Sequence, residues 1–146
     1  MLNEAVINVL KNGMWDLATC ADGEPNVVPV AFKDVIADGK LVAGDVFLDT
    51  TLRNLNVNNG KIAISAYDAN SLEGYQVKGT AAYVTEGEVV DTFKAMKKMF
   101  HGAATAKGAL ILFFSLILGY KKSDSYFKFQ GIHVIMFREI MQLWEI

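Results

Sequence analysis

Residues 41–55 read Leu-Val-Ala-Gly-Asp-Val-Phe-Leu-Asp-Thr-Thr-Leu-Arg-Asn-Leu, and this stretch organises the rest of the chain. Its first half is an apolar run that predicts a buried strand over 41–48. The side-chain oxygens of Asp49, Thr50 and Thr51 follow where a short helix over 52–57 should begin. The start of a helix leaves backbone N–H groups without partners and carries the positive end of the helix dipole. The stretch therefore predicts a strand running into a helix whose start suits an anion, best of all phosphate.

Two interpretations of this helix start stay open. The hydroxyls of Thr50 and Thr51 and the guanidinium of Arg53 would add donors for a phosphate. A capped surface helix without a ligand explains the same residues, because most helix starts bind nothing. On the stretch alone, the second interpretation is favoured.

The composition indicates a single domain with a full core. The chain has 146 residues, 52% of them hydrophobic and 21% charged, and a net charge of -2. No basic stripe is present, so nucleic acid is not an expected partner. The N-terminus lacks a basic region followed by an apolar core, which predicts a cytoplasmic protein without a signal peptide. The apolar run 109–118 is too short to span a membrane and predicts a central strand instead.

The residues that commonly carry chemistry form no recognisable motif. Cys20 is the one cysteine, and its place at the end of an apolar run predicts a buried free thiol. His101 and His133 lack neighbours at ligand spacing, so each is predicted to be structural rather than metal-binding. Nucleophile elbow, Walker loop and dinucleotide fingerprint are all missing, and no side chain is identified as catalytic. If the protein is an enzyme, a bound cofactor should carry the chemistry.

Runs separated by turn residues predict six strands and two further helices. The strands are expected over 14–20, 25–36, 41–48, 61–67, 75–85 and 107–118, and the helices over 2–10 and 89–100. Pro29 cannot donate to a ladder, so its strand should be an edge strand, or be bulged or open there. Gly79 predicts a bulge, or a close approach by another backbone or a ligand. Because helical crossovers between most strands are absent, an antiparallel barrel plugged by small helices is predicted.

The C-terminal part gives a weaker pattern. A strand is expected over 126–129 and an amphipathic helix over 132–144. The apolar face of that helix should pack on the barrel or on a second subunit, and both cases stay open. The chain is thus divided into a barrel domain, 1–118, and a C-terminal extension, 119–146.

Several segments together resemble the pyridoxamine 5'-phosphate oxidase-like FMN-binding split-barrel family, in particular its small members. The shared pattern covers roughly residues 3–112 and lies in the order and spacing of the segments rather than in one motif. The segments are 17–30 (LATCADGEPNVVPV), 51–55 (TLRNL), 61–65 (KIAIS), 74–82 (GYQVKGTAA) and 107–111 (KGALI).

The resemblance implies a mainly β protein, a six-stranded antiparallel Greek-key split barrel, and a homodimer with FMN at the subunit interface. By position, Pro29, Val30 and Ala31 would line the isoalloxazine ring. The segment Val42, Ala43, Gly44 and Asp45 would pass beside the flavin. The phosphate would lie at Thr50, Thr51 and Asn54, which is the helix start that the residues already indicate.

One departure from the family concerns the phosphate. Many relatives carry a lysine or arginine where this chain has Thr50, so FMN should bind more weakly unless Arg53 substitutes. A lost charge-assisted contact corresponds to roughly ten- to a hundredfold in affinity. A basic C-terminal segment for the vitamin B6 phosphate is also missing, so oxidation of that substrate is not expected.

The leading hypothesis is an FMN-binding flavoprotein that acts as an FMN-dependent oxidoreductase, with its redox partner unspecified. The alternative is a non-enzymatic module on the same barrel that holds haem or a flavin-like cofactor, with His101 or His133 as the axial ligand to look for. Electron transfer without a small substrate is a third reading.

Overall fold

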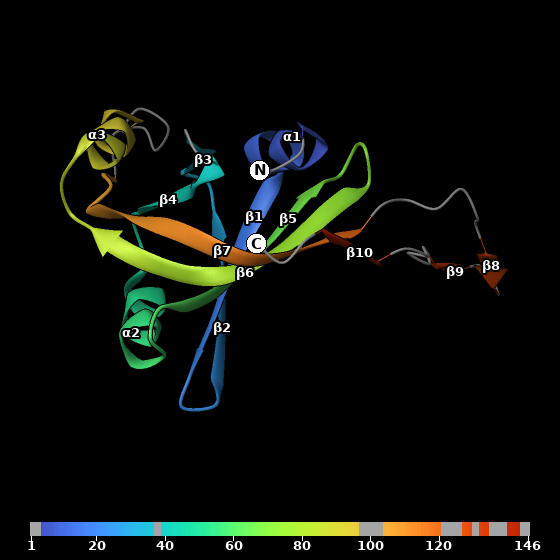
Figure 1. Ribbon diagram of the computed structural model, residues 1–146, viewed down its shortest axis with the longest axis horizontal. Helices are drawn as coiled ribbons and strands as arrows, with labels where there is room; N and C mark the ends of the chain where they lie inside the picture. Colours follow the sequence, from blue (N-terminus) through green and yellow to red (C-terminus); the bar gives the residue numbers. More distant parts are fainter. Residues whose placement is uncertain are drawn as a thin grey trace.

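Eight of the described strands form a curved antiparallel sheet with three short helices around it, and two more pair with each other in a separate hairpin (Figure 1). The computed structural model describes residues 4–36, 39–96, 104–120, 127–129, 132–134 and 140–143. Its elements are α1 (Glu4–Asn12), β1 (Met14–Ala21), β2 (Glu24–Val30), β3 (Lys33–Val35), β4 (Leu41–Asp45), α2 (Asp49–Val57), β5 (Lys61–Asp68), β6 (Glu73–Val84), α3 (Glu88–Ala95), β7 (Gly108–Tyr120), β8 (Phe127–Phe129), β9 (Ile132–Val134) and β10 (Ile140–Leu143). The mainly β, antiparallel prediction is confirmed.

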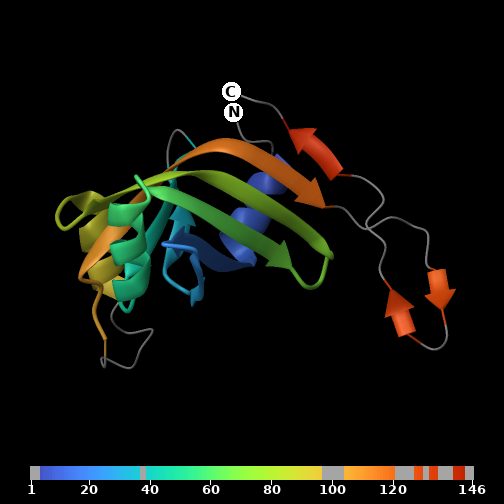
Figure 2. The same cartoon turned by 90° about the horizontal axis from the view of Figure 1, so that it is seen from below.

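The strand order explains why the sheet curls. Seven strands follow the path β2-β1-β5-β6-β7-β4-β3, and β10 pairs with β7 off this path. Because β2 and β3 are consecutive in the chain but lie at opposite ends of the path, the sheet must bend until its two edges approach. Figure 2 shows β5, β6 and β7 curving together as the wall of this half-barrel.

The prediction of six strands is wrong, because the run 25–36 forms two strands and not one. The chain bends at Ala31 and Phe32, so that β2 pairs with β1 whereas β3 pairs with β4. Phe32 turns into the interior and stacks on Phe93 of α3, with ring centroids 6.2 Å apart. Its carbonyl also accepts a hydrogen bond from the Gly44 N–H at 2.8 Å. Packing on α3 and β4 therefore fixes a bend that strand periodicity alone does not reveal.

The main core lies inside the curve and is closed by α1. The predicted N-terminal helix is confirmed, and Val6, Val9 and Leu10 form its buried face. Trp15 is fully buried, and its indole N–H donates to the Leu10 carbonyl at 2.7 Å. This bond satisfies the one polar group of a large side chain that the core would otherwise leave unpaired.

The long β6–β7 ladder carries the predicted irregularity at Gly79. The pairing register shifts between Lys78 and Gly79, which confirms the predicted bulge. A Cβ on Gly79 would collide with the Phe113 carbonyl oxygen, so no other residue fits without a backbone shift.

The C-terminal segments pair as strands. The helix predicted over 132–144 is wrong, since β9 pairs with β8 and β10 pairs with the end of β7. β4 pairs with β7 only as far as Leu112, so that edge of β7 is open over Ile117–Tyr120, where β10 completes it. The expected strand at 126–129 is confirmed by β8. The division between 1–118 and 119–146 falls inside β7, and the division itself stays a prediction.

Two smaller predictions can also be compared with the structure. Cys20 is exposed and not buried as predicted, because inward and outward side chains alternate along β1 and Thr19 takes the inward place. The helix predicted over 89–100 begins as α3 and buries Val90 and Phe93, while residues 97–103 lie outside the described residues. Among the described helices, none has the length and apolarity needed to cross a bilayer.

Candidate functional site

The start of α2 has no side-chain cap. The residue at the N-cap position is Leu48, so the prediction that Asp49, Thr50 or Thr51 caps the helix is wrong. The Asp45 side chain, three residues before this N-cap position, instead holds the loop before the helix, because its Oδ1 accepts a hydrogen bond from the Leu48 N–H at 2.9 Å. The first helical hydrogen bond runs from Leu52 to Leu48, and the N–H groups of residues 49–51 donate to no described residue. Three donors at the positive end of the helix dipole therefore remain available to an anion.

A buried polar cluster joins this helix to the first hairpin. It consists of Thr19 on β1, Asn26 on β2, and Thr51 and Asn54 on α2, and we call it the polar cluster. The Asn26 amide donates to the hydroxyls of Thr19 and Thr51 at 3.2 and 3.1 Å, and the Asn54 amide donates to Thr19 at 3.2 Å. Thr51 and Asn54 are only 1% and 3% exposed. The polar cluster therefore fixes the first turn of α2 beside the start of β2.

Thr19 and Asn26 were not among the predicted site residues. They face each other in the β1–β2 register. An inward-facing threonine in an otherwise apolar strand, opposite an asparagine across a hairpin, is the signal that identifies such a pair, since buried polar groups are nearly always hydrogen-bonded.

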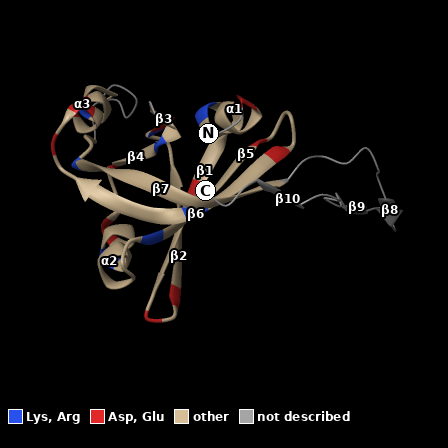
Figure 3. Ribbon diagram, in the orientation of Figure 1, with Lys and Arg blue, Asp and Glu red and all other residues tan. Residues whose placement is uncertain are grey.

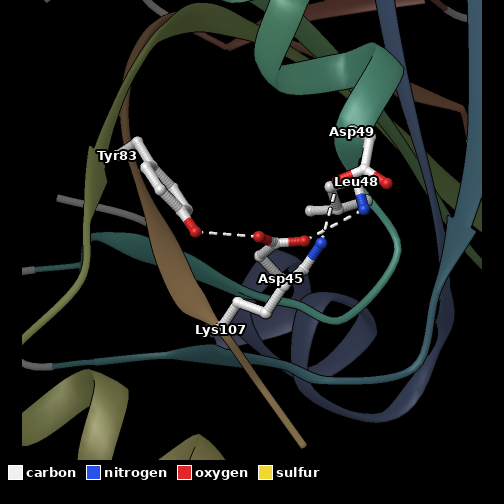
Figure 4. A network of polar contacts seen from close by, with 5 residues as sticks. All are labelled: Asp45, Leu48, Asp49, Tyr83 and Lys107. Carbon is white, nitrogen blue, oxygen red and sulfur yellow. Dashed lines mark hydrogen bonds and ion pairs between the residues drawn. The ribbon is translucent and has the colours of Figure 1, made fainter. Parts of the chain in front are cut away.

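Asp45 is a fully buried carboxylate at the end of β4 (Figure 4). Its Oδ2 accepts the Tyr83 hydroxyl at 2.8 Å, and its backbone carbonyl accepts the Lys107 N–H at 2.7 Å. Partial burial, together with the hydrogen bond to Asp45, raises the pKa of Tyr83 to about 12. Since both carboxylate oxygens are bonded, Asp45 anchors the loop between β4 and α2 to β6.

Lys107 reaches the same loop from the start of β7. Its Nζ lies 2.8 Å from Asp49 Oδ1, and the two side chains are 49% and 84% exposed. The hydrogen bond to Asp49 raises the pKa of Lys107, so the ammonium stays charged. Basic residues are spread over many elements and not gathered on one (Figure 3). Positive potential at the helix start therefore depends on particular side chains such as this one.

The predicted site residues fall into an exposed and a buried set. The exposed ones are Pro29, Ala31, Thr50 and Arg53. The buried ones are Val30, Val42, Ala43, Gly44, Asp45, Thr51 and Asn54. The polar cluster brings β2 and α2 together, whereas β4 packs beneath Phe32 and α3. The assignment of these residues to a cofactor stays a prediction.

A groove of about 720 Å³ adjoins the polar cluster on the outer face of the sheet. Its walls include Thr19 and Asn26, the lysines Lys61 and Lys78, and Phe113. Val27, which also lines it, is 63% exposed, and Phe113 is 49% exposed. The groove is thus mainly apolar, with two cations in its walls.

Metal-ligating side chains do not cluster in the part of the chain that the structure describes. Within the described residues, no group of three or more His, Cys, Asp or Glu side chains could hold a metal ion. His101 lies outside the described residues, and of His133 only the backbone in β9 is described. The predicted structural roles of both histidines therefore stay predictions.

Comparison with known proteins decides the family. The sequence model of the family described as pyridoxamine 5'-phosphate oxidase matches residues 5–117. The chain belongs to the pyridoxamine 5'-phosphate oxidase family. The family resemblance predicted from the sequence is therefore confirmed.

Relatives of this family member include proteins from archaea and bacteria. Uncharacterized protein MJ0282 of Methanocaldococcus jannaschii is 32% identical over 114 residues, which are 76% of this chain and 75% of that protein. The Group A Streptococcus protein HupZ is 26% identical with a TM-score of 0.67, covering 84% of this chain and 97% of that one. An FMN-binding protein of Syntrophomonas wolfei subsp. wolfei is 22% identical with a TM-score of 0.64, covering 79% and 81%. This last likeness establishes a shared fold.

Proposed function

We propose that this member of the pyridoxamine 5'-phosphate oxidase family is an FMN-binding flavoprotein that acts as an oxidoreductase. One observation carries the proposal. The Asn26–Thr51 hydrogen bond holds β2, whose outer edge pairs with no described strand, against the uncapped start of α2. A flavin phosphate at α2 and its ring along β2 would use both features at once.

The residues at the start of α2 fit a phosphate. The N–H groups of residues 49–51 have no described partner, and the Thr50 side chain is exposed beside them. Arg53 lies exposed on the same helix and can add a charged donor. Thr51 and Asn54 are committed to the polar cluster, so we assign them to positioning the helix start as well as to the predicted phosphate contact.

The free edge of β2 fits the ring. Pro29 and Ala31 are exposed at its end, next to the bend that leads into β3. Apolar contact from Pro29 and backbone groups along the unpaired edge would hold a flat, polar-edged ring. FMN, when bound, supplies redox chemistry at this ring, and the chain supplies its binding and orientation.

We also propose a homodimer with FMN at the interface, formed by the same surface. Val27 and Phe113 expose apolar area in the groove beside the polar cluster, and a second copy would cover it. Light scattering coupled to gel filtration tests this part, with twice the mass of the chain expected.

One observation favours a second candidate, a module without a phosphorylated cofactor. Asp49 places a carboxylate in the first turn of α2, and Thr50 adds no cation. An uncharged, flavin-like ligand without phosphate at this position would avoid the repulsion that Asp49 exerts on an anion.

The visible absorption spectrum of the purified protein tests the proposal. It should be recorded before FMN is added, and again after FMN is added and the excess is removed by gel filtration. A retained flavin band near one FMN per chain is the expected result, and a protein that stays colourless would overturn the proposal. Arg53→Ala should retain less FMN, whereas Lys94→Ala, an exposed substitution on α3, is the matched control.

A further inference from the structure

The start of α2 has a threonine and no cation at residue 50, but a lysine from a distant part of the sequence lies beside it. Lys107 lies 58 residues beyond Asp49 in the chain, yet its Nζ contacts the Asp49 carboxylate at 2.8 Å. The two side chains are drawn together in Figure 4, at the junction of α2 and β7. A cation delivered by β7 therefore lies at the helix start, where residue 50 is a threonine.

The backbone of Lys107 is held by a hydrogen bond, whereas its side chain is half exposed. The Lys107 N–H donates to the carbonyl of the fully buried Asp45 at 2.7 Å, which fixes the start of β7 beside the loop before α2. The side chain is half exposed and its ammonium has one described carboxylate partner, Asp49. A long, flexible stem anchored at its base allows the ammonium to turn from Asp49 to a ligand at the same helix start.

Asp49 makes such a cation necessary. Its carboxylate lies in the same first turn as the open N–H groups of residues 49–51, so it competes with any anion for them. A flavin phosphate carries a charge of about -1.5 to -2 near neutral pH. Without Lys107, the carboxylate and the phosphate would repel each other at close range. With Lys107 between them, one ammonium is shared by two anions.

We propose that Lys107 supplies the cation for the flavin phosphate and makes this site select a phosphorylated flavin over riboflavin, with Asp49 as the competing anion. This inference rests on the proposed function. It assigns Lys107 as a specificity-determining residue that contacts the phosphate and takes no part in the redox chemistry.

Dissociation constants for FMN and for riboflavin, measured by quenching of flavin fluorescence, test the assignment. Lys107→Gln should weaken FMN about 10- to 100-fold and change riboflavin by less than about twofold. Asp49→Asn should tighten FMN, and Lys107→Arg should keep most of the wild-type affinity. Lys94→Gln, which removes an exposed lysine from α3, is the control for a change in net charge.

A second readout separates a phosphate contact from a structural effect. Salt screens exposed charge pairs, so the affinity of the wild type for FMN should fall with ionic strength more steeply than that of Lys107→Gln. Equal losses for FMN and riboflavin, or unchanged FMN affinity in Lys107→Gln, would overturn the assignment while leaving FMN binding intact. A wild-type protein that binds neither flavin would overturn the proposed function and the assignment together.

Discussion

The Asn26 amide donates to the Thr51 hydroxyl at 3.1 Å, and this bond joins the start of β2 to the first turn of α2. The two residues are 25 positions apart and lie on opposite sides of β3 and β4 in the sequence. Each belongs to an element that would be unremarkable alone, an edge strand and a short helix. The proposed site exists only because the polar cluster places these elements side by side.

The double variant Thr51→Ala and Asn54→Ala should lose FMN. It removes two of the three hydrogen bonds of the polar cluster, Asn26–Thr51 and Asn54–Thr19, so the start of α2 is no longer held against the β1–β2 hairpin. Flavin absorbance after gel filtration measures retention, and circular dichroism confirms that the variant folds. Asn56→Ala, on the exposed side of the same helix, should retain FMN as the wild type does. A folded double variant with full FMN occupancy would show that the phosphate lies elsewhere.

Gly79→Ala should destabilise the protein by more than about 3 kcal/mol, because the new methyl group would collide with the Phe113 carbonyl oxygen inside the β6–β7 ladder. Gly23→Ala is the matched control. Gly23 has a φ of 82° but open space around it, so only backbone strain of roughly 1–2 kcal/mol is expected. Urea denaturation of both variants checks the difference, and equal losses would mean that the bulge relaxes to admit a side chain.

Structural features that are determined by a short stretch of the chain could be predicted from the sequence. The strand that leads into α2, the bulge at Gly79 and the antiparallel arrangement all depend on neighbouring residues. The bend at Phe32 could not, because it depends on stacking against Phe93 in a distant helix. The helix predicted over 132–144 failed for a related reason, since the open edge of β7 favours a paired strand there.

The candidate site, too, has features that local sequence predicts and features that it does not. The start of α2 lies within one stretch of sequence, so a helix there could be predicted, whereas the assignment of its residues to a phosphate stays a prediction. Three contacts of the site join residues that are far apart in the sequence. These are Asn26–Thr51, 25 positions apart, Asp45–Tyr83, 38 apart, and Asp49–Lys107, 58 apart. No local sequence pattern predicts them. The fold supplies the supporting contacts that residue types alone leave out.

Phe32→Ala should lower the free energy of unfolding by about 3–5 kcal/mol, since a buried ring is replaced by a cavity. Phe32 stacks on Phe93 and marks the bend between β2 and β3, so the loss should be accompanied by a looser β3. Phe47→Ala is the control, because Phe47 is exposed and its loss should change stability by less than about 0.5 kcal/mol. Guanidinium denaturation measures both, and similar values would indicate that α3 packs without Phe32.

Tyr83→Phe should alter how stability depends on pH. In the folded protein the pKa of Tyr83 is raised from its usual 10.0 to about 12, by partial burial and by the hydrogen bond to Asp45. A raised pKa means that the folded state holds the phenolic proton more tightly than the unfolded chain does. The stabilisation is therefore complete below pH 10 and is lost as the pH rises towards 12.

The stability difference between wild type and Tyr83→Phe measures this contribution directly, because lysines that titrate in the same range cancel between the two proteins. At pH 8 the wild type should be more stable than Tyr83→Phe by about 1 kcal/mol, the contribution of the single, partly buried hydrogen bond from Tyr83 to Asp45. This difference should shrink above pH 10. Tyr67→Phe, which removes an exposed hydroxyl on β5, should give no such trend. A stability difference between wild type and Tyr83→Phe that stays constant from pH 8 to 12 would mean that Asp45 does not hold the Tyr83 proton. The loop before α2 would then be held only by the contacts of Asp45 with the backbone N–H groups of Leu48 and Lys107.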